Sequence, residues 1–341
     1  MFMMVPKRKS RAVILLVCFF VLIATAFQAT GTGEPVAADG KNYIKWVEFN
    51  VPYEVLEHAL DLDIKAHEEG VDIGWVELLA YCAGKNGGNF SGFRTKTLDE
   101  LYRKIAGGEQ LADLTRDMRY YSYYYEAYSA VLSGLVGEYE IQVADESAPD
   151  GKKWVKKYGL MGFSPIAKNF PYDDYDDFGA SRTYGFARKH LGHDMMGAVG
   201  TPVIAVEGGT VEAMGWNQYG GWGIGIRSKD QKRYYYYAHL RKNYPYVKDL
   251  KVGSTVKPGD VIGYLGRTGY SSTENVNNID EAHLHFGLQL IFDESQKEGN
   301  NEIWVDVYPL VRLLYRNRSE TVKNQETKEY SRVYDIRFPG E

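Results

Sequence analysis

The spacing of apolar residues divides the chain into a helical first half and a strand-rich second half. From Val51 to about Val136 the apolar positions recur at helical spacing, as in YEVLEHALDLDIKAH and GWVELLAYCAG. We expect four or five helices in this segment. Within it, Thr97 and Glu100 have the spacing of a capping box, which predicts a helix N-terminus at Thr97.

From Thr201 onward the pattern changes to short runs rich in β-branched and aromatic residues. Glycine turns separate these runs, which are PVIAV, GTVEAM, WGIGIRS, RYYYYAHL, VIGYLG and HLHFGLQLI. Such short, regularly interrupted runs predict an antiparallel β domain of sandwich or barrel type. The stretch IWVDVYPLVRLLYR is expected to close the domain with a strand or turn and a short helix. The predicted fold class is therefore α+β and multidomain, with a helical domain followed by an antiparallel β-rich domain.

The first 30 residues have the pattern of a targeting segment. The basic KRKSR precedes an uncharged apolar run at residues 12–27, which is typical of either a signal peptide or a membrane anchor. Positive charge before the run predicts that the rest of the chain lies outside the cytoplasm. We expect the following division: leader or anchor 1–30, linker 31–45, helical domain of uncertain role 46–145, β-rich domain 160–316 and polar C-terminal tail 317–341.

Composition narrows the function classes. The 341 residues are 44% hydrophobic and 25% charged, as in an ordinary globular protein, and the formal net charge of −5 argues against a nucleic-acid partner. The 28 tyrosines would suit a groove for sugars or peptides, although many of them must be core. Cys82 is the only cysteine after the leader, so we expect no intramolecular disulfide in the exported part.

The helical half contains few residues that could form a catalytic site. Its stretch AYCAGKNGGNFSGF resembles the Glu-Ser-Gly-Gly-Asn segment of lysozyme-like transglycosylases, but Lys85 stands where the acid is needed. Without that acid a glycosidic oxygen cannot be protonated, so we expect this domain to be non-catalytic. His58 and His67 are nine residues apart, which places them on opposite faces of a helix and not in one site.

Histidines gather in the strand-rich half. Alternation in a strand puts His283 and His285 on one face, and His190 and Asp194, four apart around Gly192, can converge on one point. With His285 they would make two imidazoles and a carboxylate, the set that leaves the fourth position of a tetrahedral Zn²⁺ open. Two alternatives remain. His190 and Asp194 could form a surface ion pair or a turn hydrogen bond, and the HLH histidines could be a hydrogen-bonded strand pair.

The segment from about Tyr184 to Asp306 resembles the lysostaphin-like, or LytM-type, zinc endopeptidases that cut peptidoglycan peptides. Four motifs carry the resemblance in the family's order: HLGHD for H-x-G-x-D, GTPVIAVEGGTV, YAHL and HLHF, with the hairpin sequence VKPGDVIGYLGRTG between them. The resemblance implies that the β-rich domain at 160–316 is an endopeptidase of this type, acting on peptidoglycan peptides.

The resemblance also implies site roles. It implies zinc ligation by three residues: His190, Asp194 and His285. It further implies that His239 and His283 are catalytic histidines that polarise the attacking water and stabilise the developing oxyanion. No glutamate follows a ligand as in an H-E-x-x-H helix, so a neighbouring imidazole must handle the proton. His193 fills a variable position and by alternation faces away, so we expect a surface histidine.

Two departures from the family pattern bear on specificity. Glu281 and Ala282 stand where the family has Gly-Pro, and the preceding loop YSSTENVNNIDEA is long and polar. The sequence thus favours an exported zinc endopeptidase of cell-wall peptidoglycan. The main alternative is a non-catalytic LytM-type scaffold or activator of another cell-wall hydrolase, and membrane anchoring through residues 12–27 is possible in both cases. A carbohydrate-binding protein would rest on the tyrosines alone.

Overall fold

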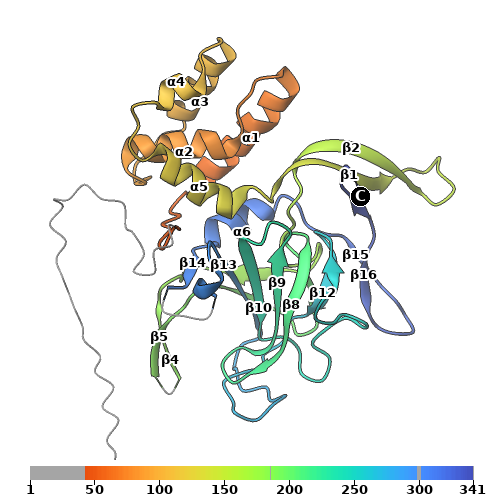
Figure 1. The fold of residues 1–341 in the computed structure, drawn as a ribbon. Coiled ribbons are helices and arrows are strands. Elements are labelled where there is room, and N and C mark those ends of the chain that lie inside the picture. Colours follow the sequence, from red (N-terminus) through yellow and green to blue (C-terminus); the bar gives the residue numbers. More distant parts are fainter. Residues whose placement is uncertain (1–42, 185, 298–300, 341) are drawn as a thin grey trace, which may run out of the picture. The chain divides into compact units, whose positions relative to one another are not determined.

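Five helices come first in the computed structural model, which describes residues 43–184, 186–297 and 301–340 (Figure 1). They confirm the helical expectation and span α1 (Tyr53–Glu69), α2 (Trp75–Asn86), α3 (Lys96–Ala106), α4 (Leu111–Thr115) and α5 (Tyr121–Leu132). Helix α1 starts after Pro52 and ends at Gly70, which takes the left-handed conformation that stops a helix. The leader and almost all of the expected linker lie outside the described residues.

The predicted capping box is wrong. Helix α3 starts at Lys96, and Leu98 N already donates to Thr95 O at 2.8 Å, so Thr97 lies inside the first turn. Glu100 pairs instead with Lys96, at 3.4 Å between Oε1 and Nζ. The helix therefore begins two residues earlier than the polar spacing suggested.

The chain after the helices forms a hairpin that the sequence did not predict. Strands β1 (Val136–Ala144) and β2 (Lys152–Leu160) pair over nine residues each, and β17 (Ile336–Arg337) adds to β1. The segment expected as a polar tail also contains β15 (Thr321–Lys323) and β16 (Tyr330–Arg332). Ile336 is fully buried, so a few apolar residues anchor this polar segment.

An eight-stranded antiparallel sheet forms the centre of the β-rich part. Its order is β11-β8-β9-β10-β13-β6-β3, with β14 also paired to β13. These strands span β3 (Tyr172–Asp174), β6 (His193–Gly197), β8 (Gly209–Asn217), β9 (Gly221–Ser228), β10 (Arg233–Ala238), β11 (Thr255–Val256), β13 (His283–Leu290) and β14 (Ile303–Val305). A separate pair joins β7 (Pro202–Ile204) to β12 (Val261–Tyr264). All six predicted runs contain a strand, and β14 with α6 (Tyr308–Leu314) confirms the predicted closing strand and helix.

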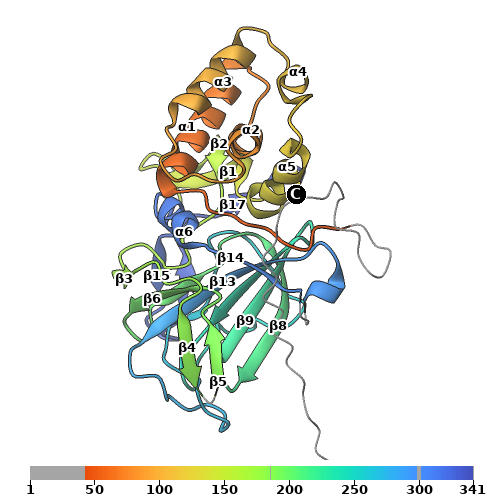
Figure 2. The same ribbon diagram turned by 90° about the vertical axis from the view of Figure 1, so that its left-hand side faces the viewer.

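A second hairpin stands in front of this sheet. Strands β4 (Ser181–Tyr184) and β5 (Phe186–Lys189) pair with each other and not with the main sheet (Figure 2). The chain leaves β5 directly into His190 and then enters β6. The hairpin therefore delivers His190 to the face of the sheet that carries the HLH motif.

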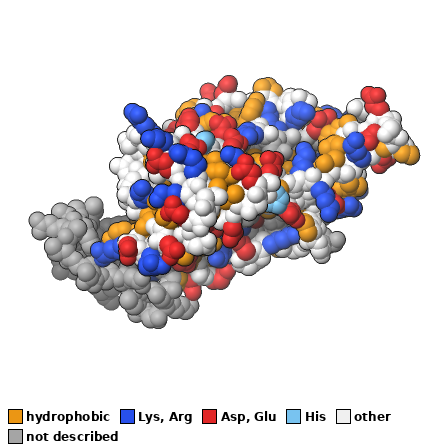
Figure 3. Space-filling view, turned by 90° about the horizontal axis from the view of Figure 1, so that it is seen from above, with side chains coloured by type: hydrophobic (Ala, Val, Ile, Leu, Met, Phe, Trp, Pro, Cys, Tyr) orange, Lys and Arg blue, Asp and Glu red, His pale blue; other side chains and the backbone are white. Residues whose placement is uncertain are grey.

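The surface over the helices carries both signs of charge. Lysine and arginine side chains alternate with aspartate and glutamate on the face seen in Figure 3, with apolar side chains between them. That face therefore presents a mixed field and not the basic patch that attracts nucleic acid. Among the helices of the described residues, none is both long enough and apolar enough to cross a membrane.

Buried charged side chains connect the helical part of the chain to the sheet. Arg233, only 2% exposed, binds Glu207 with Nε at 2.7 Å and donates through Nη1 to Ala130 O, near the end of α5, at 2.9 Å. Helices and sheet also share one cluster of buried side chains, and residues 43–341 form one compact unit. The domain border expected near residue 145 stays a prediction. The Cys82 thiol is buried among the helices, and burial raises its pKa to about 12.

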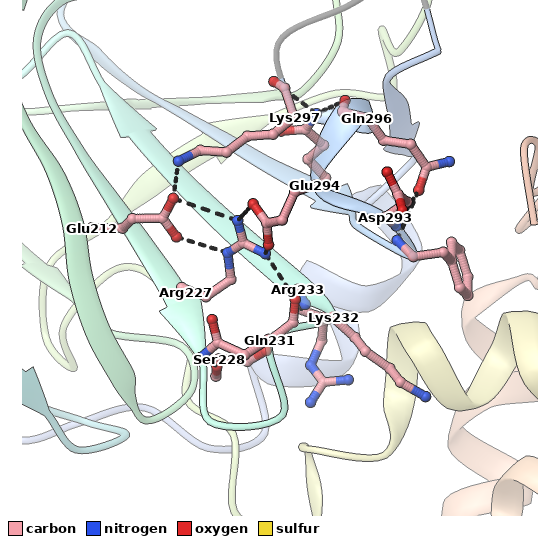
Figure 4. Close-up of polar contacts among 12 residues, drawn as sticks. Glu212, Arg227, Ser228, Gln231, Lys232, Arg233, Asp293, Glu294, Gln296 and Lys297 are labelled. Carbon is pink, nitrogen blue, oxygen red and sulfur yellow. Dashed lines mark hydrogen bonds and ion pairs between the residues drawn. The ribbon is translucent and has the colours of Figure 1, made fainter. Parts of the chain in front are cut away.

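A second network fixes the sheet edge to the 3₁₀ helix η1 (Glu294–Gln296), as Figure 4 shows. Arg227 is almost fully buried and binds Glu212 with Nε at 2.7 Å and Glu294 with Nη1 at 3.1 Å. Lys297 also contacts Glu212. Two cations thus share two carboxylates, which holds the chain after β13 against β8 and β9.

Candidate functional site

Three donor atoms converge on the face of the sheet beneath the β4–β5 hairpin. Nε2 of His190 lies 3.0 Å from Oδ1 of Asp194 and 2.9 Å from Nδ1 of His285, and the last two atoms are 2.9 Å apart. Asp194 in β6 and His285 in β13 are direct cross-strand neighbours. The fold thus brings together the three residues that the sequence suggested as metal ligands, and they could hold a metal ion.

The donor chemistry fits a divalent metal. Nδ1 of His190 lies 3.0 Å from Oδ1 of Asp177, which can only accept, so His190 keeps its lone pair on Nε2. Nε2 of His190 faces a carboxylate oxygen and a second imidazole nitrogen, and a cation between these three atoms, whether a proton or a metal ion, would be stabilised there. Ligands about 2.1 Å from a tetrahedral Zn²⁺ stand about 3.4 Å apart, so slight outward shifts would admit the ion.

The surroundings favour a charged Asp194 carboxylate and a neutral His285. Burial acts to lower the pKa of His190, but its hydrogen bond and charge interaction with Asp194 outweigh burial and raise this pKa. Burial acts to raise the pKa of Asp194, but hydrogen bonds with His190 and His285 outweigh it and hold this pKa well below its usual range. Burial lowers the pKa of His285, against the opposing effect of Asp194. Arg182 in β4 contacts Asp177 and lies 3.5 Å from Oδ2 of Asp194, so both acids share one cation.

His239 and His283 lie beside the three donors. Their ring centroids are 4.7 Å apart, and Nε2 of His283 is 3.8 Å from Oδ1 of Asp194. Nδ1 of His239 donates to Thr268 O and Nδ1 of His283 donates to Glu281 O, both at 2.9 Å. Each neutral ring therefore carries its lone pair on Nε2. Burial, followed by the two neighbouring imidazoles, holds the pKa of His239 well below its usual range.

Two backbone features hold the site in shape. His239 has φ of 59°, a left-handed conformation that a residue with a side chain adopts at a cost, and such strain is concentrated at functional sites. Gly192 lies so close to the site that an added Cβ would be 2.5 Å from Cε1 of His285. The glycine of the HLGHD motif is thus explained by the position of the His285 ring.

The expectation that His193 lies at the surface is wrong. It is 1% exposed and not a surface histidine; its Nε2 lies 2.9 Å from Oδ2 of Asp174, and its ring packs against Tyr308. Strand β3 and helix α6 supply these partners, and neither was visible from alternation within β6. His58 and His67 lie outside the site, as expected, in contact with Asp99 and stacked on Tyr158.

Sequence reasoning missed Asp177 and Arg182. Asp177 belongs to the acidic loop PYDDYDDFG, thirteen residues before His190, and Arg182 lies across the hairpin from β5. Neither has a local pattern that links it to the histidines. The only signal was a concentration of carboxylates shortly before the first candidate ligand.

Comparison with known proteins identifies relatives of the β-rich part. Residues 188–299 match Peptidase family M23. The L-Ala–D-Glu endopeptidase of Bacillus subtilis (strain 168) is 35% identical over 168 residues, 48% of each protein. Lysostaphin of Staphylococcus simulans is 39% identical over 98 residues, 28% of this chain and 17% of that protein. The chain thus spans about half or less of these curated relatives. Among solved structures, the catalytic domain of Staphylococcus simulans lysostaphin is 31% identical, with a TM-score of 0.33 over 41% of this chain and 92% of that one.

Proposed function

We propose that the protein is a zinc-dependent endopeptidase of bacterial cell-wall peptidoglycan, on the basis that residues 188–299 match peptidase family M23. The observation that carries the proposal is the convergence of two imidazoles and one carboxylate within 3.0 Å of one another. Two histidines and one acidic ligand with an open fourth position are typical of hydrolytic zinc sites.

In this proposal His190, Asp194 and His285 hold the zinc ion. Zinc, when bound, supplies Lewis-acid chemistry that polarises the scissile carbonyl and makes water a stronger nucleophile near neutral pH. Asp177 fixes the tautomer of His190, and a carboxylate behind a ligating histidine is a common arrangement in such sites.

His239 and His283 handle the protons. Their Nδ1 atoms donate to backbone oxygens, which leaves the lone pairs on Nε2, so either imidazole can accept a proton as water attacks the carbonyl carbon. The imidazolium so formed can donate to the developing oxyanion and then return the proton to the leaving amine nitrogen. The peptide C–N bond breaks, and one new carboxyl group and one new amine form.

The substrate assignment comes from the relatives. The relative named L-Ala–D-Glu endopeptidase aligns with a larger share of this chain than lysostaphin does, so the L-Ala–D-Glu bond is the first bond to test. We assign the enzyme to the outside of the cytoplasm, because the leader pattern predicts export. The scaffold alternative is not favoured, because the three candidate ligands and both neighbouring histidines are all present.

Digestion of purified peptidoglycan tests the proposal. The zinc-loaded protein, the same protein after chelation, and the chelated protein given zinc again would each be incubated with walls of several peptide types. Mass spectrometry should show new peptide termini with the loaded protein, none after chelation, and recovery with zinc. Cleavage that persists after complete metal removal would disprove zinc dependence, and the absence of any peptide product would disprove the assignment to peptidoglycan.

A further inference from the structure

Arg188 has the right position to meet a substrate. It lies in β5, two residues before His190, so alternation places both side chains on the same face of the hairpin. Its cross-strand partner in β4 is Arg182, which contacts Asp177 and Asp194. The face of the hairpin turned toward the proposed zinc site therefore carries two arginines side by side.

Only one of these two arginines is neutralised. Two carboxylates share Arg182, whereas Arg188 has no ion pair among the described residues. Like charges that face each other across strands destabilise a hairpin, so an uncompensated Arg188 at this position has a cost. The retained charge therefore points to a ligand of opposite sign.

Two tyrosines hold the guanidinium in place. Its central carbon lies 5.3 Å from the ring centre of Tyr219 and 5.1 Å from that of Tyr270, and Nη2 donates to the Tyr270 hydroxyl at 2.8 Å. Nη1 is buried and finds no hydrogen-bond acceptor among the described residues. A buried donor without an acceptor costs free energy, and a ligand oxygen would remove that cost.

The same tyrosine connects Arg188 to the proposed catalytic histidines. The ring centre of Tyr270 lies 5.9 Å from that of His239, in an edge-to-face arrangement. Tyr270 has φ of 48°, a strained left-handed conformation, immediately after Gly269, at which an added Cβ would lie 3.1 Å from Nδ1 of His239. The Tyr270 ring thus contacts both the Arg188 guanidinium and the ring of His239.

We infer that Arg188 binds a free carboxylate of the substrate peptide, on the residue next to the scissile bond. The inference rests on the proposed peptidase function and deepens it by naming an anionic peptide as the substrate class. The planar guanidinium matches a carboxylate in geometry and charge, and its two tyrosines hold it ready for that contact. Arg188 would determine specificity and would take no part in the proton transfers.

Two peptides that contain the L-Ala–D-Glu bond, one with the free glutamate α-carboxylate and one with its carboxamide, provide the test. Initial rates would be compared for the zinc-loaded protein, Arg188→Met, Arg188→Lys and Lys189→Met. Lys189→Met is the matched control, because it removes an exposed positive charge from the next position of the same strand, on the opposite face. Zinc content would be measured for each variant.

The unaltered protein should prefer the carboxylate peptide by roughly ten- to hundredfold in kcat/KM, the worth of a charge-assisted hydrogen bond. Arg188→Met should abolish this preference while it retains zinc and cleaves the carboxamide peptide at a similar rate. Arg188→Lys should keep part of the preference, and Lys189→Met should keep all of it.

Two results would overturn the inference while the peptidase proposal stands. One is an equal preference in the unaltered protein and Arg188→Met, and the other is no preference in the unaltered protein. If neither peptide is cleaved, their binding to the zinc-loaded protein decides: carboxylate discrimination that depends on Arg188 supports the inference, and its absence overturns it.

Discussion

Oδ1 of Asp177 lies 3.0 Å from Nδ1 of His190, so a carboxylate from the loop before β4 determines which nitrogen of His190 faces the proposed zinc site. The same carboxyl group contacts Arg182, which also reaches Asp194. The orientation of a proposed ligand therefore depends on a residue outside every motif that marks the site in the sequence.

Asp177→Ala should weaken zinc binding about ten- to hundredfold, the usual effect of removing the carboxylate behind a ligating histidine. The reason is that His190 can then turn or protonate Nε2 in place of Nδ1. Competition with a chromogenic chelator measures the affinity. Asp173→Ala, an exposed acid from the same acidic loop, is the matched control and should bind zinc normally. Equal affinities for the two variants would contradict a role for Asp177.

Gly192→Ala should also lose zinc, but for a steric reason. The new Cβ would lie 2.5 Å from Cε1 and 2.6 Å from Nε2 of His285, and 2.9 Å from the backbone oxygen of Phe286, so the ring has to move. Gly137→Ala adds the same methyl group in β1, where the nearest atoms are 3.6 Å away, and should be neutral. Metal analysis and circular dichroism of both variants distinguish loss of zinc from loss of the fold. Stoichiometric zinc in Gly192→Ala would refute this explanation.

The buried pair of Glu207 and Arg233 should be necessary for stability. Arg233→Met leaves Glu207 buried without its cation, and breaking a buried pair typically costs about 3–5 kcal/mol. Glu207→Gln should cost less, because Asp230 Oδ2 still accepts from Arg233 Nη2 at 2.9 Å, and the double variant should cost less than the sum, because no buried charge is left without its partner. Urea unfolding followed by circular dichroism measures all three. Additive losses would show that the two side chains act independently.

The sequence predicted what depends on short-range patterns. Helical spacing predicted four or five helices between Val51 and about Val136, where the structure has α1 to α5. Alternation placed His283 and His285 on one face, and the interval from His190 to Asp194 indicated convergence, which the structure shows. These patterns are local because periodicity follows from the backbone geometry of each element. The roles assigned to these residues stay predictions.

The errors came from contacts between distant segments. His193 was expected at the surface because the sequence does not show that β3 and α6 cover its side of β6. The capping box at Thr97 failed because the burial of Leu98 and its neighbours fixes where α3 begins. Asp177 was overlooked since loop residues far from a motif have no spacing rule. Tertiary packing, not local propensity, decided each case.

The central claim is that the two histidines of the HLH motif have different roles, one holding zinc and the other moving protons. Zinc content and peptide hydrolysis, measured together on His283→Ala and His285→Ala with His58→Ala as the control outside the site, test it most directly. His285→Ala should lose both zinc and activity, because one of three protein ligands is gone. His283→Ala should keep its zinc and lose about a hundred- to ten-thousandfold in rate, the usual contribution of a general acid–base group. Equal zinc retention in the two variants, with hydrolysis intact in either one, would contradict the claim.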